Sequence, residues 1–291
     1  MIRRVAVIGA GTMGRGIAQS AAQAGYETTL FDAAPGVPER ARGEIEATLE
    51  KGIARGKVTA EEKAAALGRL GLETDLARAV QDADLVVEAV PERLDLKRDL
   101  FRELDAGAPG TAILGSNTSS LSIADIAEWV EWPGRVLGLH FFNPVHLMRL
   151  VEIVVAPGTA RETVETARAF VESLGKRPIV VRDTPGFATS RLGLTLGLEA
   201  MRMMEEEVAT AEDIDLAMEL GYNHPMGPLK LTDLVGLDVR LAIAEHLAST
   251  IDPTRFDPPG ILRRLVEEGK LGRKTGEGFY LWRDGEAVAK K

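Results

Sequence analysis

The chain has 291 residues and a formal net charge of −9, with 44 acidic and 35 basic side chains. This acidic balance disfavours a nucleic-acid partner, which requires a basic surface to neutralise phosphates. The chain has no cysteine, which excludes disulfides, thiolate zinc sites and cysteine nucleophiles. A cysteine-free composition fits a reducing compartment, so we expect a cytoplasmic protein. Every apolar run is much shorter than the roughly 20 residues of a membrane span, so we expect no membrane partner.

Short apolar runs alternate with helical patterns over the first part of the chain. The runs are rich in Val and Ile and lack polar alternation, which is typical of strands buried on both faces. They are Val5–Ile8, Thr28–Phe31, Leu85–Val90, Ala112–Leu114, Val136–Phe142, Val151–Val155 and Ile179–Val181. The helical patterns are Met13–Ala24, Pro38–Ile53, Leu94–Leu104, Ser122–Val130 and Arg161–Leu174. This alternation predicts an α/β fold with a doubly wound, mainly parallel sheet.

The segment Pro38–Leu67 is too long for a simple crossover between two strands. Within it, Thr59-Ala60-Glu61-Glu62 has the pattern of a capping box, which starts a helix. We therefore expect two helices that form an antiparallel hairpin projecting beside the sheet.

The pattern changes after Asp183-Thr184-Pro185-Gly186. Helical patterns then follow at Phe187–Glu207, Glu212–Leu220, Leu229–Ser249 and Ile261–Glu268, and a further strand is expected only at Gly278–Trp282. We therefore predict a sheet-containing domain at residues 1–183 and an all-helical C-terminal domain at residues 184–291.

A glycine-rich segment, Gly9-Ala10-Gly11-Thr12-Met13-Gly14, follows the first predicted strand and opens a helix. In such a G-x-G-x-x-G motif the glycines permit a tight turn, a close approach of pyrophosphate and close helix packing. The hexapeptide alone is weak evidence, but Asp32 ends the second strand about 20 residues later, as the motif requires. That carboxylate would accept hydrogen bonds from ribose hydroxyls and repel a 2′-phosphate. The sequence therefore predicts a Rossmann-type domain that binds NAD rather than NADP.

The catalytic candidates begin with the histidines, which are His140, His146, His224 and His246. Their spacing does not match a helical zinc motif, so no metal site is expected. His140 ends one apolar strand and Glu152 lies within the next. A lone histidine there is more often a satisfied core residue, but a carboxylate in a buried strand is costly unless it is paired. Pairing would orient the imidazole, so the two residues are candidates for a proton-transfer dyad.

The segment Ser116-Asn117-Thr118-Ser119-Ser120 follows the strand Ala112–Leu114. Small hydroxyl and amide groups at the carboxyl end of a strand face the ligand crevice of an open α/β sheet. Alternatively, Ser119 or Ser120 caps the helix that starts near Ser122. The residues alone support the two readings equally.

Several of these segments resemble the L-3-hydroxyacyl-CoA dehydrogenase family, including its short-chain 3-hydroxybutyryl-CoA branch. The similar segments, in order over nearly the whole chain, are Val7–Gly14, Ser116–Ser120, His140–Pro144, Val151–Glu152, Asp183–Phe187, Pro225–Pro228 and Lys274–Tyr280. The resemblance implies NAD-dependent oxidation of (S)-3-hydroxyacyl-CoA to 3-oxoacyl-CoA, as in the β-oxidation of fatty acids, with short substrates such as 3-hydroxybutyryl-CoA. It also implies a homodimer formed through the helical domain.

The resemblance also implies roles for individual residues. It assigns His140 as the base, Glu152 as its partner and Ser119 as a contact of the substrate hydroxyl. The residues implied to bind NAD are Gly9, Gly11, Thr12, Met13, Gly14, Asp32, Glu92, Lys97, Asn117, Asn143 and Lys274.

Four further residues are implied to contact the substrate. Thr48 and Arg55 fall at positions of CoA-binding residues, and Lys57 is nearby; a solvated helix face explains these cations equally well. Ser190 occupies a position where the family usually has an Asn that lines the active site. Serine cannot duplicate the paired donor and acceptor of an amide, so a water replaces it or substrate preference differs.

Two other functions are compatible with the sequence. A hydroxy-acid or sugar-acid dehydrogenase of the same superfamily would share the cofactor site and His140 but would not use CoA. A non-enzymatic NAD-binding structural or sensor protein would share the fold, which alone does not establish an activity. The candidate pair of His140 and Glu152 argues against the second alternative, because NAD binding requires neither residue.

Overall fold

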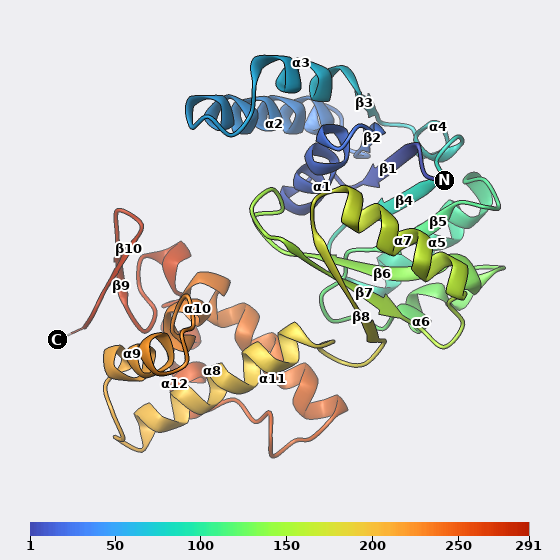
Figure 1. Ribbon diagram of the computed structural model, residues 1–291. Helices are drawn as coiled ribbons and strands as arrows, with labels where there is room; N and C mark the ends of the chain where they lie inside the picture. Colours follow the sequence, from blue (N-terminus) through green and yellow to red (C-terminus); the bar gives the residue numbers. More distant parts are fainter. Residues whose placement is uncertain (291) are drawn as a thin grey trace. The chain divides into compact units, whose positions relative to one another are not determined.

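The structure, a computed structural model, describes residues 1–290. The chain divides into two compact units, which we call unit 1 (Met1–Thr184) and unit 2 (from Pro185 onward). Figure 1 shows the elements of each unit, coloured along the sequence.

Unit 1 is built on an eight-stranded sheet with the order β3-β2-β1-β4-β5-β6-β7-β8. The strands are β1 (Arg4–Ile8), β2 (Glu27–Phe31), β3 (Leu70–Glu73), β4 (Leu85–Glu88), β5 (Ile113–Ser116), β6 (Val136–Phe141), β7 (Leu150–Val155) and β8 (Arg177–Arg182). Strands β1 to β6 are parallel, and β7 and β8 run in the opposite direction. The strand order reverses between β1 and β4, which opens a crevice at the carboxyl ends of these strands. The predicted doubly wound sheet is confirmed.

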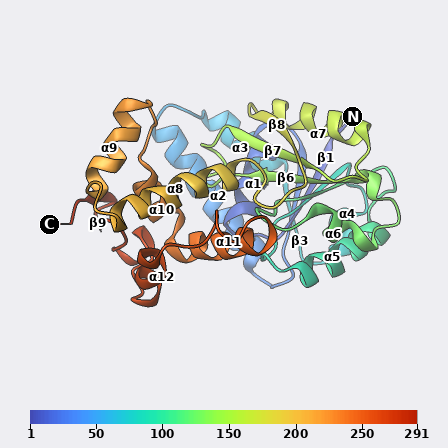
Figure 2. The ribbon, with the colours of Figure 1, turned by 90° about the horizontal axis from the view of Figure 1, so that it is seen from below.

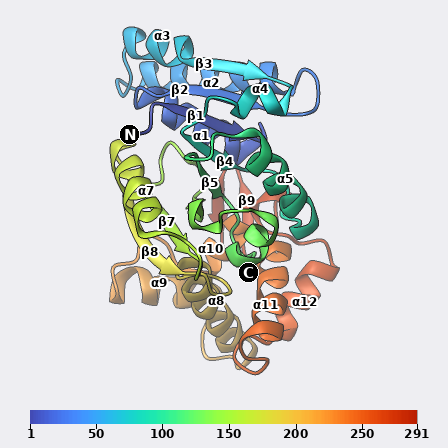
Figure 3. The same ribbon diagram turned by 90° about the vertical axis from the view of Figure 1, so that its right-hand side faces the viewer.

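Helices cover both faces of this sheet, as Figures 2 and 3 show. One face carries α1 (Thr12–Gln23) and α7 (Arg161–Ser173), and the other carries α4 (Leu76–Val80), α5 (Leu94–Gly107) and α6 (Ile123–Ile126). Short 3-10 turns follow at η1 (Ala127–Trp129) and η2 (Pro133–Arg135). The central strands are buried on both faces, but Ile179 and Val180 of the edge strand β8 are 37% and 42% exposed. The prediction of full burial was wrong for β8, because an edge strand has a neighbour on one side only.

The predicted helical hairpin is present as α2 (Val37–Ala54) and α3 (Ala60–Gly68). The Thr59 hydroxyl accepts a hydrogen bond from the Glu62 amide, and the Glu62 carboxylate accepts one from the Thr59 amide. This reciprocal capping box starts α3 as expected. The chain then enters β3, a strand that the sequence analysis missed. Its four residues carry a weak pattern, and they form a strand because they pair with β2 at the sheet edge.

Unit 2 consists mainly of helices. They are α8 (Thr189–Glu205), α9 (Ala211–Gly221), α10 (Pro228–Val235), α11 (Leu237–Thr250) and α12 (Gly260–Glu267), with a 3-10 turn η3 (Arg273–Thr275). The prediction of a single helix over Leu229–Ser249 was wrong. Gly236 has a φ of 104°, which is outside the helical region and separates α10 from α11. A two-stranded hairpin of β9 (Leu281–Arg283) and β10 (Glu286–Val288) completes the unit, so it is not wholly helical.

A buried carboxylate ties the C-terminal segment of unit 2 to its helices. Asp233, at the end of α10, is 1% exposed. It accepts hydrogen bonds from the backbone amides of Phe279 and Tyr280 and from the indole of Trp282, all at 2.8–2.9 Å. Three donors converge on one carboxylate, so both oxygens are needed as acceptors.

We therefore expect Asp233→Asn to lower the free energy of unfolding by about 1–3 kcal/mol, because an amide nitrogen cannot accept the hydrogen bonds that a carboxylate oxygen accepts. Chemical denaturation of the purified variant measures this change. Asp284→Asn is the matched control, because Asp284 is exposed and its φ of 52° suits Asn equally well. Equal stability of the two variants would show that the Asp233 network does not stabilise the fold.

Candidate active site

The loop between β1 and α1 is shaped by its glycines. Gly9 has a φ of 100°, and a Cβ there would lie 2.8 Å from the Ala89 carbonyl oxygen. A Cβ at Gly14 would lie only 1.8 Å from the Gly9 carbonyl oxygen, so α1 packs against the loop at a distance that only glycine permits. A Cβ at Gly11 would meet nothing within 4 Å. The backbone at Gly11 is therefore open to a ligand.

The surroundings of this loop suit an anionic dinucleotide. The first turn of α1 contains no acidic residue, so its backbone amides present a positive helix end to the loop. The Asp32 carboxylate accepts hydrogen bonds from the amides of Ala10 and Ala34, both at 3.0 Å, which hold it beside the loop. Gly11, Thr12 and Asp32 line a cavity of about 480 Å³. These residues fit NAD, with the pyrophosphate at the helix end and the ribose at Asp32.

A second cavity of about 300 Å³ adjoins the first, since Met13, Ala89 and Val90 line both. Polar side chains of several predicted site residues line it: Glu92, Asn117, Ser119, His140 and Asn143. The structure thus brings the serine-rich segment, the histidine and the glycine loop to one crevice at the carboxyl ends of the strands.

His140 and Glu152 face each other across two antiparallel strands, β6 and β7, where they form a register pair. The His140 Nδ1 lies 2.7 Å from the Glu152 Oε2. Glu152 is fully buried and His140 is 6% exposed. A carboxylate at this distance in a dry environment fixes the ring orientation and stabilises an imidazolium. The pair can therefore accept and return a proton at the wall of the second cavity.

Glu92 holds the serine-rich segment in place. Its Oε1 accepts hydrogen bonds from the Thr118 hydroxyl at 2.6 Å and from the Ser119 amide at 2.9 Å. Burial alone raises the pKa of Glu92, but the charge of Lys97 and the hydrogen bonds from Thr118 and Ser119 outweigh burial and hold that pKa below its usual range. Glu92 is therefore an anion at neutral pH, and Ser119 is fixed at the cavity by its own backbone.

The sequence analysis missed a buried ion pair behind Glu92. Glu88, at the end of β4, and Lys97 of α5 are 0% and 1% exposed, and their charged atoms lie 2.6 Å apart. The Ser116 hydroxyl and the Val90 amide also donate to Glu88, and Lys97 lies 3.4 Å from Glu92. The sequence pattern could have predicted a partner for Glu88. Like Glu152, it is an acid in an apolar strand, and a buried carboxylate is costly unless it is paired.

The remaining polar residues of the segment have separate roles. The Asn117 side-chain oxygen accepts a hydrogen bond from the Phe141 amide at 2.9 Å, which ties the end of β5 to the end of β6. Ser122 caps α6 by accepting a hydrogen bond from the Asp125 amide. The alternative in which Ser119 or Ser120 is the cap was therefore wrong, and Ser119 lines the cavity instead.

The predicted CoA-contact residues lie on the helical hairpin. The Thr48 hydroxyl donates to the Glu44 carbonyl within α2. Arg55 and Lys57 are exposed in the turn after α2. Desolvation, and then the charges of Lys176 and Lys57, lower the pKa of His146.

Two predicted site residues belong to unit 2. Ser190 lies in the first turn of α8. Lys274 forms an ion pair with Asp238 of α11, with an Nζ to Oδ1 distance of 2.5 Å.

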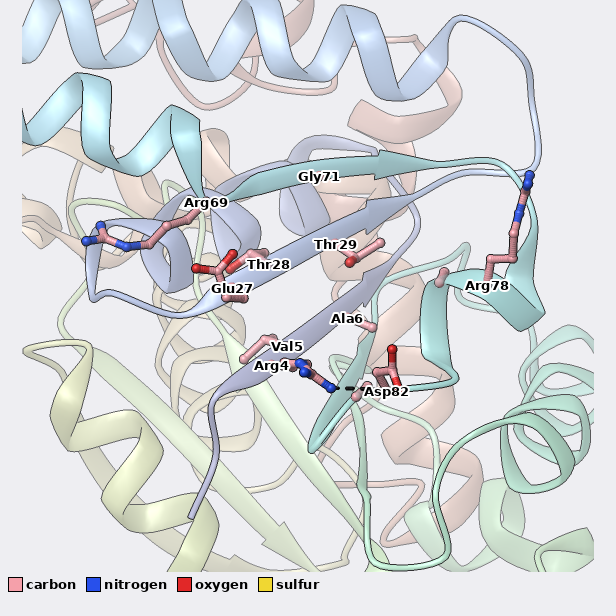
Figure 4. Close-up of a pocket in the computed structure, with 12 residues that line it drawn as sticks. Arg4, Val5, Ala6, Glu27, Thr28, Thr29, Arg69, Gly71, Arg78 and Asp82 are labelled. Carbon is pink, nitrogen blue, oxygen red and sulfur yellow. Dashed lines mark ion pairs between the residues drawn. The ribbon is translucent and has the colours of Figure 1, made fainter.

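A third cavity of about 200 Å³ lies at the opposite, amino-terminal half of β1, β2 and β3 (Figure 4). Two of its three cations already have acidic neighbours, and the third, Arg69, donates to the Ala22 carbonyl at 3.4 Å. Arg4 lies 3.7 Å from Asp82, and Arg78 lies 3.1 Å from Glu73. The cavity is therefore a poorer ligand site than the crevice at the carboxyl ends.

Residues 1–290 contain neither a candidate metal site nor a candidate membrane span. No group of three His, Asp or Glu side chains is placed to hold a metal ion. No helix in the same range has both the length and the apolar character needed to cross a bilayer.

Two family models match consecutive parts of the chain. Residues 4–184 match the 3-hydroxyacyl-CoA dehydrogenase, NAD binding domain, and residues 186–282 match the 3-hydroxyacyl-CoA dehydrogenase, C-terminal domain. The chain is 41% identical to the probable 3-hydroxybutyryl-CoA dehydrogenase of Bacillus subtilis, over 96% of this chain and 97% of the relative. It is 43% identical to the mitochondrial hydroxyacyl-coenzyme A dehydrogenase of Rattus norvegicus, over 97% and 92% of the two chains.

Solved structures agree with this assignment. The crystal structure of (S)-3-hydroxybutyryl-CoA dehydrogenase from Ralstonia eutropha superimposes with a TM-score of 0.94 at 37% identity, covering 98% of this chain and all of the other. The matches extend over the glycine loop, the His140–Glu152 strands and the helices of unit 2 alike. The chain therefore belongs to the NAD-dependent 3-hydroxyacyl-CoA dehydrogenase family.

Proposed function

We propose that this chain catalyses the reversible oxidation of (S)-3-hydroxyacyl-CoA to 3-oxoacyl-CoA. The observation that carries the proposal is the His140–Glu152 pair, 2.7 Å apart at the wall of a cavity that adjoins the glycine loop. A protein that only binds NAD has no use for a buried imidazole–carboxylate pair beside the cofactor crevice. A sensor or structural role therefore leaves the pair unexplained.

In the oxidation, His140 accepts the proton of the 3-hydroxyl group, and in the reduction it returns that proton. NAD, when bound, supplies the acceptor for the hydride that leaves C3 of the substrate. Glu152 orients the imidazole and stabilises its protonated form. The Ser119 hydroxyl, held through its backbone by Glu92, donates to or accepts from the substrate oxygen.

The proposed NAD contacts fall into two groups. The glycine loop, Thr12, Met13 and Asp32 serve the adenosine and pyrophosphate half. Glu92, Asn117 and Asn143 of unit 1 and Lys274 of unit 2 serve the nicotinamide half. Lys97 acts through Glu92, because the Lys97 side chain is 1% exposed and enclosed by two carboxylates.

For the substrate, we propose that Thr48, Arg55 and Lys57 bind the CoA moiety and that Ser190 lines the acyl site. The exposure of Arg55 and Lys57 supports the hairpin assignment, because their charges are free to meet phosphate groups. The relatives named for 3-hydroxybutyryl-CoA support short acyl chains. The alternative of a sugar-acid or free hydroxy-acid dehydrogenase has no structural observation in its favour.

We also propose a homodimer formed through unit 2 and a role in β-oxidation in the cytoplasm. Large apolar side chains are exposed on α8 and α9 and in the turn after α9, as a dimer interface would require. The most exposed are Leu192, Leu196, Leu220 and Tyr222, at 66%, 44%, 80% and 76%. The cytoplasmic location remains a prediction of the cysteine-free composition.

We expect the enzyme to prefer NAD over NADP, because the anchored Asp32 carboxylate repels a 2′-phosphate. Asp32→Ser should lower the ratio of kcat/KM with NAD to kcat/KM with NADP by about 10- to 100-fold, which is the range of a charged hydrogen bond. Steady-state assays with both cofactors measure it. Asp82→Ser, at the third cavity, is the control and should keep the native ratio. A native enzyme that prefers NADP would contradict the assignment of Asp32.

The double variant Arg55→Ala, Lys57→Ala should lower kcat/KM for 3-hydroxybutyryl-CoA by about tenfold, because two cations that face CoA phosphates are lost. The double variant should not change kcat/KM for the N-acetylcysteamine thioester, which lacks the nucleotide. Lys63→Ala is the control on the same hairpin, since Lys63 already pairs with Glu50 at 2.7 Å. If the native enzyme used both thioesters equally well, the hairpin would have no role in CoA recognition.

His140 and Glu152 should act as one unit. We expect His140→Gln to lower kcat by about 10²–10⁴-fold with NAD binding preserved, the usual contribution of a general acid–base group. Glu152→Gln should also be severe, because the ring then loses its orienting anion. The double variant should be little worse than the poorer single variant.

A complete double-mutant cycle on folded proteins tests this coupling, with NAD titration and thermal melting as controls for each variant. Two penalties that simply multiply would show that the residues act independently. A nearly active His140→Gln enzyme would remove the base assignment and with it the main support for the proposed reaction.

A further inference from the structure

Unit 1 contains a buried lysine that the proposed reaction does not use. Lys176 lies in the turn between α7 and β8 and is 9% exposed. Its ammonium donates hydrogen bonds to the carbonyl oxygens of Val145, at 2.5 Å, and of Met148, at 2.8 Å. Both carbonyls belong to the segment between β6 and β7, which we call the β6–β7 loop (residues 142–149). The lysine therefore ties this loop to a turn that is distant in the sequence.

The partners of Lys176 differ from those of Lys97, the buried lysine behind the active site. Lys97 lies between the carboxylates of Glu88 and Glu92, which neutralise its charge. Lys176 donates to carbonyl oxygens instead, and among residues 1–290 no carboxylate forms an ion pair with it. Burial therefore lowers the pKa of Lys176. The charge-assisted hydrogen bonds to the loop offset the cost of burying this ammonium.

A second contact fixes the same loop against α1. The Val145 side chain is 3% exposed and packs on the backbone of Gly16. A Cβ at Gly16 would lie 2.8 Å from both the Cβ and the Cγ2 of Val145, so only glycine permits this approach. Gly16 is about one turn after Met13, which lines the second cavity. Val145 is thus held by Lys176 through its carbonyl and by α1 through its side chain.

The β6–β7 loop begins at the second cavity. Its first two residues, Phe142 and Asn143, both line that cavity. The Phe142 ring also packs on the His140 imidazole, with the ring centroids 4.4 Å apart. Further along, the Pro144 carbonyl accepts a hydrogen bond from the Met148 amide at 3.0 Å, which closes the loop on itself. Contacts made by the later part of this closed loop therefore fix where its first two residues stand in the cavity.

We propose that Lys176 is a positioning residue for the nicotinamide half of the cofactor, and that it acts by holding the β6–β7 loop against α1. This rests on the proposed function, which assigns Asn143 to that half of NAD. With the two hydrogen bonds of Lys176 in place, Phe142 and Asn143 are held ready for the nicotinamide ring. Without them the loop is free to shift, and the nicotinamide end of the site loses a fixed wall. The glycine loop and Asp32 hold the other half of the cofactor and do not depend on this lysine.

The test compares two ligands, NADH and ADP-ribose, of which the second lacks the nicotinamide ring. Lys176→Met should raise the Kd for NADH about tenfold, because two charge-assisted hydrogen bonds are lost, and should leave the Kd for ADP-ribose within about twofold of the native value. Lys176→Arg should stay closer to the native Kd for NADH, because it keeps cationic donors. Calorimetric titration of the purified proteins measures both constants. Arg168→Met, at a partly exposed cation of α7, is the control and should keep both native values.

Gly16→Ala displaces the same loop while leaving the lysine intact. The added Cβ would push Val145 away from α1, so the Kd for NADH should rise and the Kd for ADP-ribose should not, although alanine favours a helix more than glycine does. Gly43→Ala, in α2, is the matched control, since a Cβ there would meet nothing within 4 Å. Gly16→Ala also decides the question if Lys176→Met does not fold.

Equal losses of affinity for NADH and ADP-ribose in Lys176→Met would show a general structural role and would overturn the proposal. NADH binding that is unchanged in Lys176→Met, or in Gly16→Ala if Lys176→Met does not fold, would overturn it as well. These titrations require no acyl substrate, so they are independent of the dehydrogenase assay. A native enzyme that binds NADH but does not oxidise 3-hydroxybutyryl-CoA in the presence of NAD would refute the proposed reaction and not the role of Lys176 in nicotinamide binding.

Discussion

Charged groups buried at the carboxyl ends of the central strands need partners, and this need organises the active site. Glu88 is satisfied by Lys97, Ser116 and Val90, and Glu152 lies against His140. Each pair links two elements of the sheet or a strand to a helix. Because breaking such a pair leaves an uncompensated buried charge, the elements cannot shift independently. The cavity that these elements surround is consequently rigid beside His140.

The Glu88–Lys97 and His140–Glu152 pairs share one architecture but differ in their exposure to the cavity. The Glu88–Lys97 pair is closed to solvent on both sides, at 0% and 1% exposure, and supports Glu92 and through it the Ser119 backbone. The His140–Glu152 pair opens onto the cavity through His140. A closed pair can position its neighbours but cannot exchange a proton with a ligand. An open pair can do both, which is why the histidine and not the lysine is suited to chemistry.

Unit 2 contains two buried charged side chains, Asp233 and Arg240, which differ in their hydrogen-bond partners. Asp233 is satisfied by three donors from the C-terminal segment, so its burial strengthens the fold. Arg240 of α11 is 5% exposed, and its Nε has no hydrogen-bond partner among the described residues.

The sequence by itself determined the doubly wound sheet, the helical hairpin and the glycine loop, because these depend on local patterns. Apolar runs, a capping box at Thr59 and glycines at fixed spacing each act within a few residues of the chain. It also singled out His140 and Glu152, since an acid in an apolar strand requires a partner. Tertiary structure alone decided the edge strand β3, the break between α10 and α11 at Gly236, and the ion pair of Glu88 with Lys97. Each of these depends on contacts between segments distant in sequence or on a backbone angle. Glycine permits such an angle, but the presence of a glycine does not predict it. For the same reason Arg240 drew no attention in the sequence, because its burial and its lack of a partner are properties of packing.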